Sequence, residues 1–201
     1  AIVLKESGLP IGSIGLHHND LAEKEDEAEL GYWLGVDYWG QGLVPEAARE
    51  LLRHAFLDLN LARIWCGYYD GNEKSKRVQE KLGFKYQWTT GDAPVPQMGE
   101  TRKGHVSLLT KDEWENLITL YTPSLEDLWF RQKMMADTET MSYNQAWGGT
   151  IPFPKEEWRG WYDYWIIKHE GKRYYRYLKN NAGHFIGELA YHYDSDRKLY
   201  L

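Results

Sequence analysis

The chain has 201 residues and a mass of 23.6 kDa; 42% of its residues are hydrophobic and 27% are charged, which excludes a disordered or fibrous protein. Thirty acidic and 24 basic residues give a net charge of −6, which argues against a broad nucleic-acid surface and suits a cationic partner. Mean hydropathy is −0.66 and no stretch approaches 18 apolar residues, so no membrane span is expected. Cys66 is the one cysteine, and no leader peptide is recognisable, so we expect a cytoplasmic protein without internal disulfides.

Turn residues divide the first half of the chain into short elements. Strands are predicted at 1–5, 11–18, 29–34, 61–69, 84–89 and 102–109. Apolar residues at three- and four-residue spacing predict a helix over about 47–59, with Pro45 in its first turn, and a second helix over 73–82. Asn72 is expected to cap this second helix, and Gly83 is expected to end it in a left-handed conformation.

The polar segments between these elements are interpreted as loops. The acidic stretch 19–28 is expected to be solvated, although its cluster of carboxylates at 23–27 could also steer a cationic acceptor. The segment 35–42 is a loop that contains three glycines. A short helical segment over 111–117 closes this half.

The second half of the chain starts a new pattern. Strands are predicted at 117–121, 173–179 and 185–193. Helices are predicted at about 123–136 and 155–168. The last two strands form a hairpin around Asn181-Ala182-Gly183, and the stripe Trp158, Trp161, Trp165 is interpreted as the buried side of the second helix.

The hairpin at the end of the chain matches the hairpin at its start. With a constant offset of 175 residues and no gap, the identical pairs are Gly8 and Gly183, Ile11 and Ile186, Gly12 and Gly187, and His17 and His192. Turn position and strand lengths agree as well, which favours repetition over the chemistry that all hairpins share. The repeated unit would be a domain, so the chain would hold the end of one domain followed by the start of another.

A glycine-rich segment between a predicted strand and a predicted helix is the most informative motif. Within 34–47, Gly40 and Gly42 allow a ligand to approach the backbone closely. The free backbone amides of 41–44 would point outward at the positive end of the helix dipole, which is an arrangement that binds a pyrophosphate. A plain strand–loop–helix connection is the competing interpretation. The segment is neither a G-x-G-x-x-G fingerprint nor a phosphate-binding P-loop.

Three segments resemble motifs of the GNAT N-acetyltransferase superfamily, and of its RimJ/RimL-like branch in particular. Trp39-Gly40-Gln41-Gly42, followed by Glu46-Ala47, is similar to the acyl-CoA signature of that branch, although Trp39 and Val44 depart from the general superfamily pattern. The segment from Asp70 to Phe84 resembles the family helix that begins with Asn-x-x-Ser and ends with Lys-x-Gly-Phe. Residues 29–34 resemble the fourth strand of the family, whose end splays to admit the acyl group.

The resemblance implies a mixed α/β (α+β) GNAT fold, with a mostly antiparallel sheet, a splayed central strand pair and flanking helices. Residues 1–117 would be the acetyl-CoA-binding C-terminal portion of one GNAT domain, and residues 118–201 resemble the N-terminal portion of a second one. We expect an incomplete tandem, in which the hairpin 173–193 lies apart from the sheet that contains 29–34. The alternatives are a permuted single domain, which the short connection at 111–115 disfavours, and a chain completed by swapping with a second copy.

The resemblance also implies acetyl transfer from acetyl-CoA to a primary amine of a protein N-terminus or a small molecule, by direct attack on the thioester. The implied acetyl-CoA contacts are Leu34, Val36, Trp39, Gly40, Gln41, Gly42, Leu43, Val44, Asn72 and Ser75. Glu29 is the candidate base or water-positioning residue, and Ser75 is the candidate donor to the leaving thiolate. Tyr32 and Trp33 alternate across their strand, so one of them is expected to face the acceptor amine.

Two other classes of function are compatible with these residues. A non-catalytic acyl-CoA sensor or pseudo-enzyme half, and a structural interaction domain, remain open as alternatives. No metal is expected, because His17 and His18 have no Cys or carboxylate partner at metal spacing, and Cys66 is expected to be buried and inert. Neither nucleic acid nor membrane is expected as a partner, whereas a homodimer or swapped assembly remains open.

Overall fold

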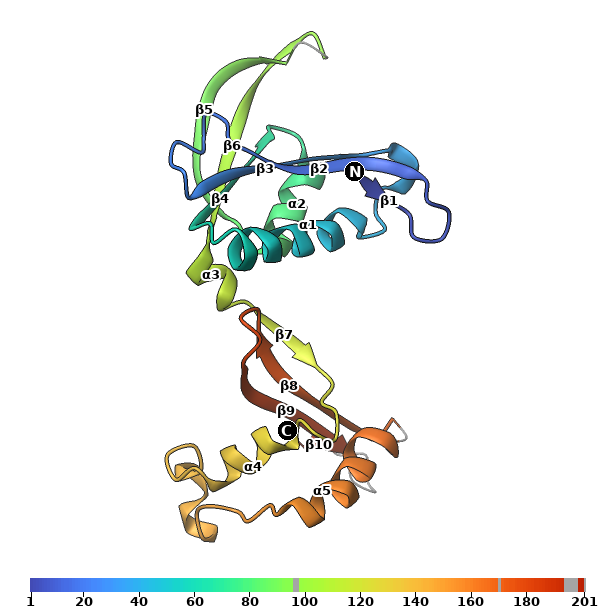
Figure 1. The fold of residues 1–201 in the computed structure, drawn as a ribbon, viewed down its shortest axis with the longest axis vertical. Helices are drawn as coiled ribbons and strands as arrows, with labels where there is room; N and C mark the ends of the chain where they lie inside the picture. The colour runs from blue at the N-terminus through green and yellow to red at the C-terminus, as the bar shows by residue number, and fades with distance from the viewer. Residues whose placement is uncertain (96–97, 170, 194–198, 201) are drawn as a thin grey trace. The chain divides into compact units, whose positions relative to one another are not determined.

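The computed structural model describes residues 1–95, 98–169, 171–193 and 199–200 (Figure 1). The chain divides into two compact units, Ala1–Leu117 (unit 1) and Ile118–Leu201 (unit 2). Each unit contains its own sheet and its own hydrophobic core. No helix in the described parts of the chain combines the length and the apolar character that crossing a bilayer requires.

Unit 1 is built on a six-stranded sheet with the order β1-β2-β3-β4-β6-β5. Its strands are β1 (Ile2–Val3), β2 (Pro10–His17), β3 (Glu27–Leu34), β4 (Arg63–Tyr69), β5 (Lys85–Val95) and β6 (Glu100–Thr110). Every neighbouring pair is antiparallel except β3 and β4, which are parallel. The predicted fold class, a mixed α/β protein with a mostly antiparallel sheet, is confirmed.

The one parallel pair of unit 1 is only partly paired. Residues 27–29 of β3 pair with residues 63–65 of β4, although β3 continues to Leu34 and β4 continues to Tyr69. The backbone on this side of β3 is therefore unpaired with β4 beyond Glu29. An unpaired strand edge inside a sheet is a place where an extended ligand can form backbone hydrogen bonds.

Helices cover one face of the unit 1 sheet (Figure 1). They are α1 (Leu43–Arg53), which continues as the π-helical turn η2 (His54–Asp58), α2 (Glu73–Leu82) and α3 (Lys111–Glu115). Ala48 and Leu52 of α1 pack on Leu30 of β3 and Ile64 of β4 in the core. Because side chains alternate along a strand, the even-numbered residues of β3 face these helices and the odd-numbered ones face away.

Some predicted strand limits in unit 1 are wrong. Strand β3 begins at Glu27 rather than at Glu29, and Glu27 is only 6% exposed although it was expected in a solvated loop. Its carboxylate accepts hydrogen bonds from Arg63 Nη1 (3.0 Å) and Trp65 Nε1 (2.9 Å), so partners 36 and 38 residues away bury it. Strands β5 and β6 are also longer than predicted, because they pair with each other along a ribbon that the alternation of apolar residues does not mark.

Unit 2 contains a four-stranded antiparallel sheet with the order β10-β9-β8-β7. Its elements are β7 (Ile118–Tyr121), α4 (Leu128–Ala136), the 3-10 turn η3 (Ser142–Trp147), α5 (Lys155–Tyr162) with its π-helical continuation η4 (Asp163–Ile167), β8 (Arg173–Asn180), β9 (Phe185–Tyr193) and β10 (Leu199–Tyr200). The hairpin of β8 and β9 thus belongs to a different sheet from β3, as expected. Trp158, Trp161 and Trp165 pack in the unit 2 core, which confirms their interpretation as the buried side of the helix.

Helix α4 begins later than predicted, at Leu128 instead of near Pro123. The Asp127 carboxylate accepts hydrogen bonds from the backbone amide (2.8 Å) and the hydroxyl (2.7 Å) of Ser124. This local turn competes with a helical conformation for the segment 124–127.

The hairpin of β1 and β2 and the hairpin of β8 and β9 carry a bulge at the same position. In the first hairpin Ile2 and Val3 pair with Gly12 and Pro10, and in the second Leu178 and Lys179 pair with Gly187 and Phe185. The unpaired residue is Ile11 in the first hairpin and Ile186 in the second. These two isoleucines are one of the identical pairs separated by 175 residues. A bulge is a specific irregularity, so its recurrence adds a structural likeness to the sequence likeness.

Candidate active site

The glycine-rich loop leads from the end of β3 into helix α1. It contains the 3-10 turn η1 (Val36–Tyr38), and Gly42 is the residue that precedes α1. Gly40 and Gly42 both have a φ of +79°, and a Cβ atom added to either would meet nothing within 4 Å. The glycines are therefore required by the backbone conformation, and the space in front of them is open.

The amides at the start of α1 have no internal acceptor. Among the described residues, none of the hydrogen bonds uses the backbone N–H groups of 41–44. These groups lie at the positive end of the helix dipole, and buried or ligand-facing N–H groups are normally paired. The geometry suits an anion such as a phosphate, which was the sequence-based expectation for this loop.

Trp39 connects the loop to two other elements. Its indole Nε1 donates a hydrogen bond to the Leu34 carbonyl (2.8 Å), which ties the loop to the end of β3. The Lys74 ammonium of α2 lies 3.6 Å from the centroid of the Trp39 ring. This contact holds a positive charge against the loop, and no carboxylate in the described parts of the chain pairs with it. The sequence reasoning missed Lys74, since a lysine in the first turn of a helix is an ordinary surface residue.

Asn72 and Ser75 begin helix α2. The Asn72 Oδ1 atom accepts a hydrogen bond from the Ser75 backbone N–H (3.1 Å), so Asn72 caps the helix as predicted. The Ser75 hydroxyl lies 2.7 Å from the Tyr32 hydroxyl, and the Ser75 carbonyl, 3.3 Å from the same Tyr32 oxygen, is a second acceptor for its hydrogen. Two side chains singled out from segments 43 residues apart are thus in contact.

The pKa of Tyr32 is raised above its ordinary value. The main cause is burial, which disfavours the charged phenolate, and the nearby Cys66 adds to it. Hydrogen bonds with Ser75 and Gln79 oppose this effect without cancelling it. Tyr32 is therefore a neutral hydrogen-bond donor at all physiological pH values.

The backbone of Leu34 is directed toward the unpaired side of β3. The Gly35 N–H donates to the Ile11 carbonyl of β2 (2.8 Å). In an antiparallel ladder, successive residues point their N–H groups to opposite sides, so the Leu34 N–H is directed away from β2. This direction is compatible with the expectation that Leu34 contacts acetyl-CoA.

Glu29 and Trp33 lie on the face of β3 opposite to Tyr32. Glu29 is half-buried at the last position where β3 pairs with β4, and within the described residues nothing bonds its carboxylate. Trp33 is 65% exposed, so its side chain lies on the uncovered face of the sheet, whereas Tyr32 faces the helices. The structure therefore brings Ser75 and Tyr32 together and places Glu29 on the other side of the sheet.

Cys66 faces the helix-covered core of unit 1. The residue is buried, and its thiol donates to the Leu30 carbonyl at 3.2 Å. Burial, followed by the negative charge of Glu29, raises the pKa of the Cys66 thiol to about 12. A thiol in this state is a poor nucleophile, in agreement with the expected inert role.

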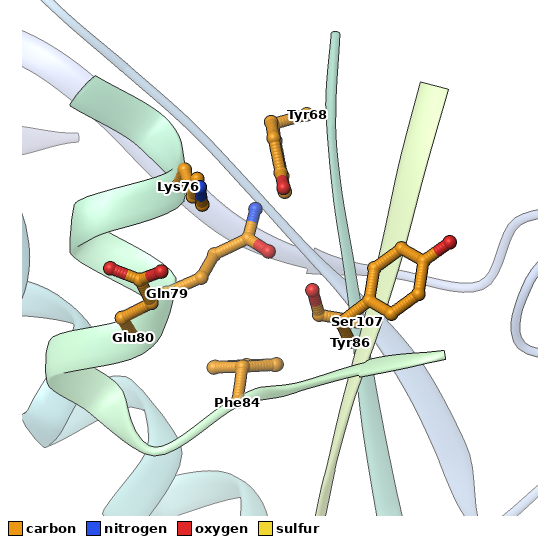
Figure 2. Close-up of a pocket in the computed structure, with 7 residues that line it drawn as sticks. All are labelled: Tyr68, Lys76, Gln79, Glu80, Phe84, Tyr86 and Ser107. Carbon is orange, nitrogen blue, oxygen red and sulfur yellow. The ribbon is translucent and has the colours of Figure 1, made fainter. Parts of the chain in front are cut away.

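A cavity of about 310 Å³ lies between α2 and strands β4, β5 and β6 (Figure 2). It is lined by Tyr68, Lys76, Gln79, Glu80, Phe84, Tyr86 and Ser107. None of the residues predicted to bind acetyl-CoA or the acceptor lines it. Gln79 is 2% exposed; its Nε2 atom donates to the Gly67 carbonyl (3.2 Å), while its Oε1 atom has no partner among the described residues. The cavity meets the site formed by the loop, Tyr32 and Ser75 at Gln79, which interacts with the Tyr32 hydroxyl.

Comparisons with known proteins agree on one family for unit 1. Residues 1–85 match the acetyltransferase (GNAT) domain family. Over 104 residues the chain is 36% identical to the putative ribosomal N-acetyltransferase YdaF of Bacillus subtilis (strain 168), a match that covers 52% of this chain and 55% of that protein. Over 118 residues it is 30% identical to the FsC-acetyl coenzyme A-N(2)-transacetylase of Aspergillus fumigatus, covering 56% of this chain and 47% of that protein.

Solved structures include similar proteins as well. A crystal structure described as a probable acetyltransferase shares 34% identity, with a TM-score of 0.48, and the match covers 53% of this chain and 59% of that one. The chain thus spans about half the length of the curated relatives it matches.

Proposed function

Because residues 1–85 of this chain match the GNAT acetyltransferase domain family, and their motifs resemble its RimJ/RimL-like branch, we propose that the protein transfers the acetyl group of acetyl-CoA to a primary amine. The observation that carries the proposal is the set of free amides at 41–44 beside the unpaired edge of β3. A pyrophosphate and an extended thioester arm would satisfy both sets of backbone groups. The open space in front of Gly40 and Gly42 fits such a ligand.

The proposed cofactor contacts follow from these groups. The amides of 41–44 hold the pyrophosphate, and Lys74, held over Trp39, adds a positive charge beside it. The Asn72 side-chain N–H group is left for the pantetheine arm, because its Oδ1 atom is used by the helix cap. The N–H groups of Leu34 and Val36 point to the thioester carbonyl and stabilise the negative charge that develops on its oxygen.

The proposed acceptor approaches from the face of β3 that the helices leave uncovered. Glu29 and the exposed Trp33 lie there, and a carboxylate next to an aromatic ring favours a cationic amine. Glu29 takes a proton from the amine, directly or through water, because only the neutral amine is a nucleophile.

Bound acetyl-CoA supplies an activated acetyl group, whose C–S bond breaks as the C–N bond to the amine forms, with the electron pair passing to sulfur. Ser75, on the helix-covered side of the sheet, donates a hydrogen bond to that sulfur. Glu29 and Ser75 thus act from opposite faces of the sheet at the point where β3 and β4 cease to pair. This division keeps the proton-accepting group away from the group that stabilises the thiolate.

For unit 2 we propose the N-terminal portion of a second GNAT domain, following the C-terminal portion in unit 1. The shared bulge and the offset of 175 residues support the equivalence of the two hairpins. In unit 2 the hairpin follows a strand and two helices, which is the order expected for the front of the fold.

Activity on a panel of amines tests the proposed function. The 201-residue chain is incubated with acetyl-CoA and N-terminal peptides, polyamines or aminoglycosides, and the free thiol is measured. We expect turnover with at least one amine, and about a hundredfold lower kcat for Glu29→Gln with unchanged thermal stabilisation by CoA. Glu25→Gln, in the exposed acidic loop, is the matched control and should retain wild-type activity. Stabilisation by CoA without turnover on any amine would support a sensor instead, and absence of any stabilisation would overturn acetyl-CoA binding itself.

A further inference from the structure

The proposed function uses the Ser75 hydroxyl alone, but the structure pairs this hydroxyl with that of Tyr32. The two oxygen atoms are 2.7 Å apart, so one hydroxyl donates to the other. Tyr32 is on β3 and Ser75 is in the first turn of α2, so the bond crosses from the sheet to the helix that borders the cofactor site. The proposed hydrogen bond from Ser75 to the CoA sulfur requires that the Ser75 hydroxyl hydrogen is not used within the protein.

The direction of this hydrogen bond decides whether Ser75 can serve as a donor. If Ser75 donates to Tyr32, its single hydrogen is used inside the protein. If Tyr32 donates to the Ser75 oxygen, the Ser75 hydrogen is left for a ligand. Burial keeps the phenol neutral, so Tyr32 has one hydrogen, for which Ser75 Oγ at 2.7 Å and the Ser75 carbonyl at 3.3 Å compete. The shorter contact favours donation to Oγ. A negatively charged sulfur beyond Ser75 favours the second direction, because aligned hydroxyl groups polarise one another toward an anion.

We propose that Tyr32 is a positioning residue, whose hydroxyl donates to Ser75 Oγ and thereby directs the Ser75 hydrogen to the thiolate of CoA. This inference rests on the proposed function. Tyr32 keeps its own proton throughout, so no proton is transferred within the pair. Its ring also packs on buried residues of both clusters in the unit 1 core, which holds the hydroxyl in place.

The test measures the ionisation of bound CoA and requires no acceptor amine. CoA is bound to the 201-residue chain, and its thiol is titrated by the ultraviolet absorbance of the thiolate, with desulfo-CoA as the blank. We expect the thiol pKa to be lower in the wild-type complex than in free CoA, and about one unit higher in the Tyr32→Phe complex than in the wild-type complex. Ser75→Ala should raise it at least as much, and the double variant should match Ser75→Ala, because the two hydroxyls act as one chain.

The control is Tyr68→Phe, which makes the same chemical change on β4 at a phenol that forms no hydrogen bond among the described residues. This control should titrate as wild type. In turnover, Tyr32→Phe should lower kcat about tenfold with an unchanged KM for acetyl-CoA, since the phenylalanine ring keeps the packing.

The outcomes separate this inference from the proposed function. A wild-type chain that binds no CoA overturns the proposed function. A wild-type complex that binds CoA with the thiol pKa of free CoA overturns the role of the hydroxyl pair, whatever the variants do. Equal thiol pKa values in the wild-type and Tyr32→Phe complexes overturn the role of Tyr32 and leave acetyl transfer intact.

Discussion

Two glutamates on one face of β3 have different surroundings although they are only two residues apart. Glu27 is buried, and its carboxylate is bonded by Arg63 and Trp65 of the neighbouring strand. Glu29, at the last paired position, keeps an unpartnered carboxylate within the described structure. The first arrangement stabilises the start of the parallel pair, whereas the second leaves a carboxylate free to accept a proton.

Replacement of Glu27 tests the stabilising role. Burial raises the pKa of Glu27, but the hydrogen bonds from Trp65 and Arg63 outweigh it and hold the pKa below the ordinary value of 4.5. A carboxyl whose folded-state pKa is lowered stabilises the protein above its unfolded pKa, and this contribution is lost as the pH falls through the folded pKa. We expect Glu27→Gln to lower the free energy of unfolding by about 2 kcal/mol at neutral pH, with a smaller difference from wild type below pH 4.5.

Denaturant unfolding at several pH values measures this difference. The exposed Glu25→Gln serves as the control and should change the free energy of unfolding little at any pH. A loss caused by Glu27→Gln that is the same at acid and neutral pH would contradict the charge-based explanation.

Among the elements, helix α2 combines structural roles with the proposed ligand-binding role at its first turn. Asn72 caps the helix with its side-chain oxygen, and Ser75 receives that bond through its backbone while its hydroxyl contacts Tyr32. At the other end Gly83 adopts a φ of +89°, and an added Cβ would lie 2.8 Å from Leu117. Both ends of α2 are therefore held by specific residues, which keeps Ser75 at a defined height above β3.

Two substitutions at Asn72 separate capping from binding. Asn72→Ala should lower the free energy of unfolding by about 1 kcal/mol and weaken CoA binding as well. Asn72→Asp keeps the cap oxygen and favours the helix dipole, so the melting temperature should stay near the wild-type value. Because aspartate has no N–H group to donate, we expect its CoA affinity to fall nevertheless. Thermal melts and calorimetric titration give the two quantities, and wild-type affinity in Asn72→Asp would refute the proposed cofactor contact.

At the scale of the whole molecule, the β1–β2 and β8–β9 hairpins, which we propose to be equivalent, are covered on opposite faces. Ile11 of β2 is buried with Val44 of α1 and is 4% exposed, whereas the equivalent Ile186 of β9 is 48% exposed. Conversely, Ala190 and Phe185 of β9 pack against the core that α4 and α5 cover. Within its own unit, each hairpin is thus covered on a different face, which is the pattern expected if the two units are the proposed different portions of one domain type.

The same substitution in the two hairpins should therefore have different costs. Ile11→Ala removes buried side-chain atoms and should lower the free energy of unfolding by about 2–4 kcal/mol. Ile186→Ala removes a half-exposed side chain and should change it by about 0.5 kcal/mol or less. Equilibrium unfolding of both variants measures the two values, and equal losses would contradict the difference in coverage.

Local patterns in the sequence determined most of the secondary structure and the motifs of the candidate site. Alternation and helical spacing predicted the strands and helices of both units, since these elements depend on residues a few positions apart. The glycine-rich loop and the Asn-x-x-Ser start of α2 indicated, before any geometry was known, the family that residues 1–85 match. The cap by Asn72 and the left-handed Gly83 followed from the same local chemistry.

Only the tertiary structure decided which of these residues meet. Whether Tyr32 or Trp33 faces the helices depends on which side of the sheet α1 and α2 cover, and alternation along β3 fits either choice. Three contacts join residues that are 35 to 43 positions apart: Tyr32 with Ser75, Glu27 with Arg63, and Trp39 with Lys74. Such contacts depend on the register of β3 against β4 and on the packing of α2, and neither is determined by the sequence near any one of these residues.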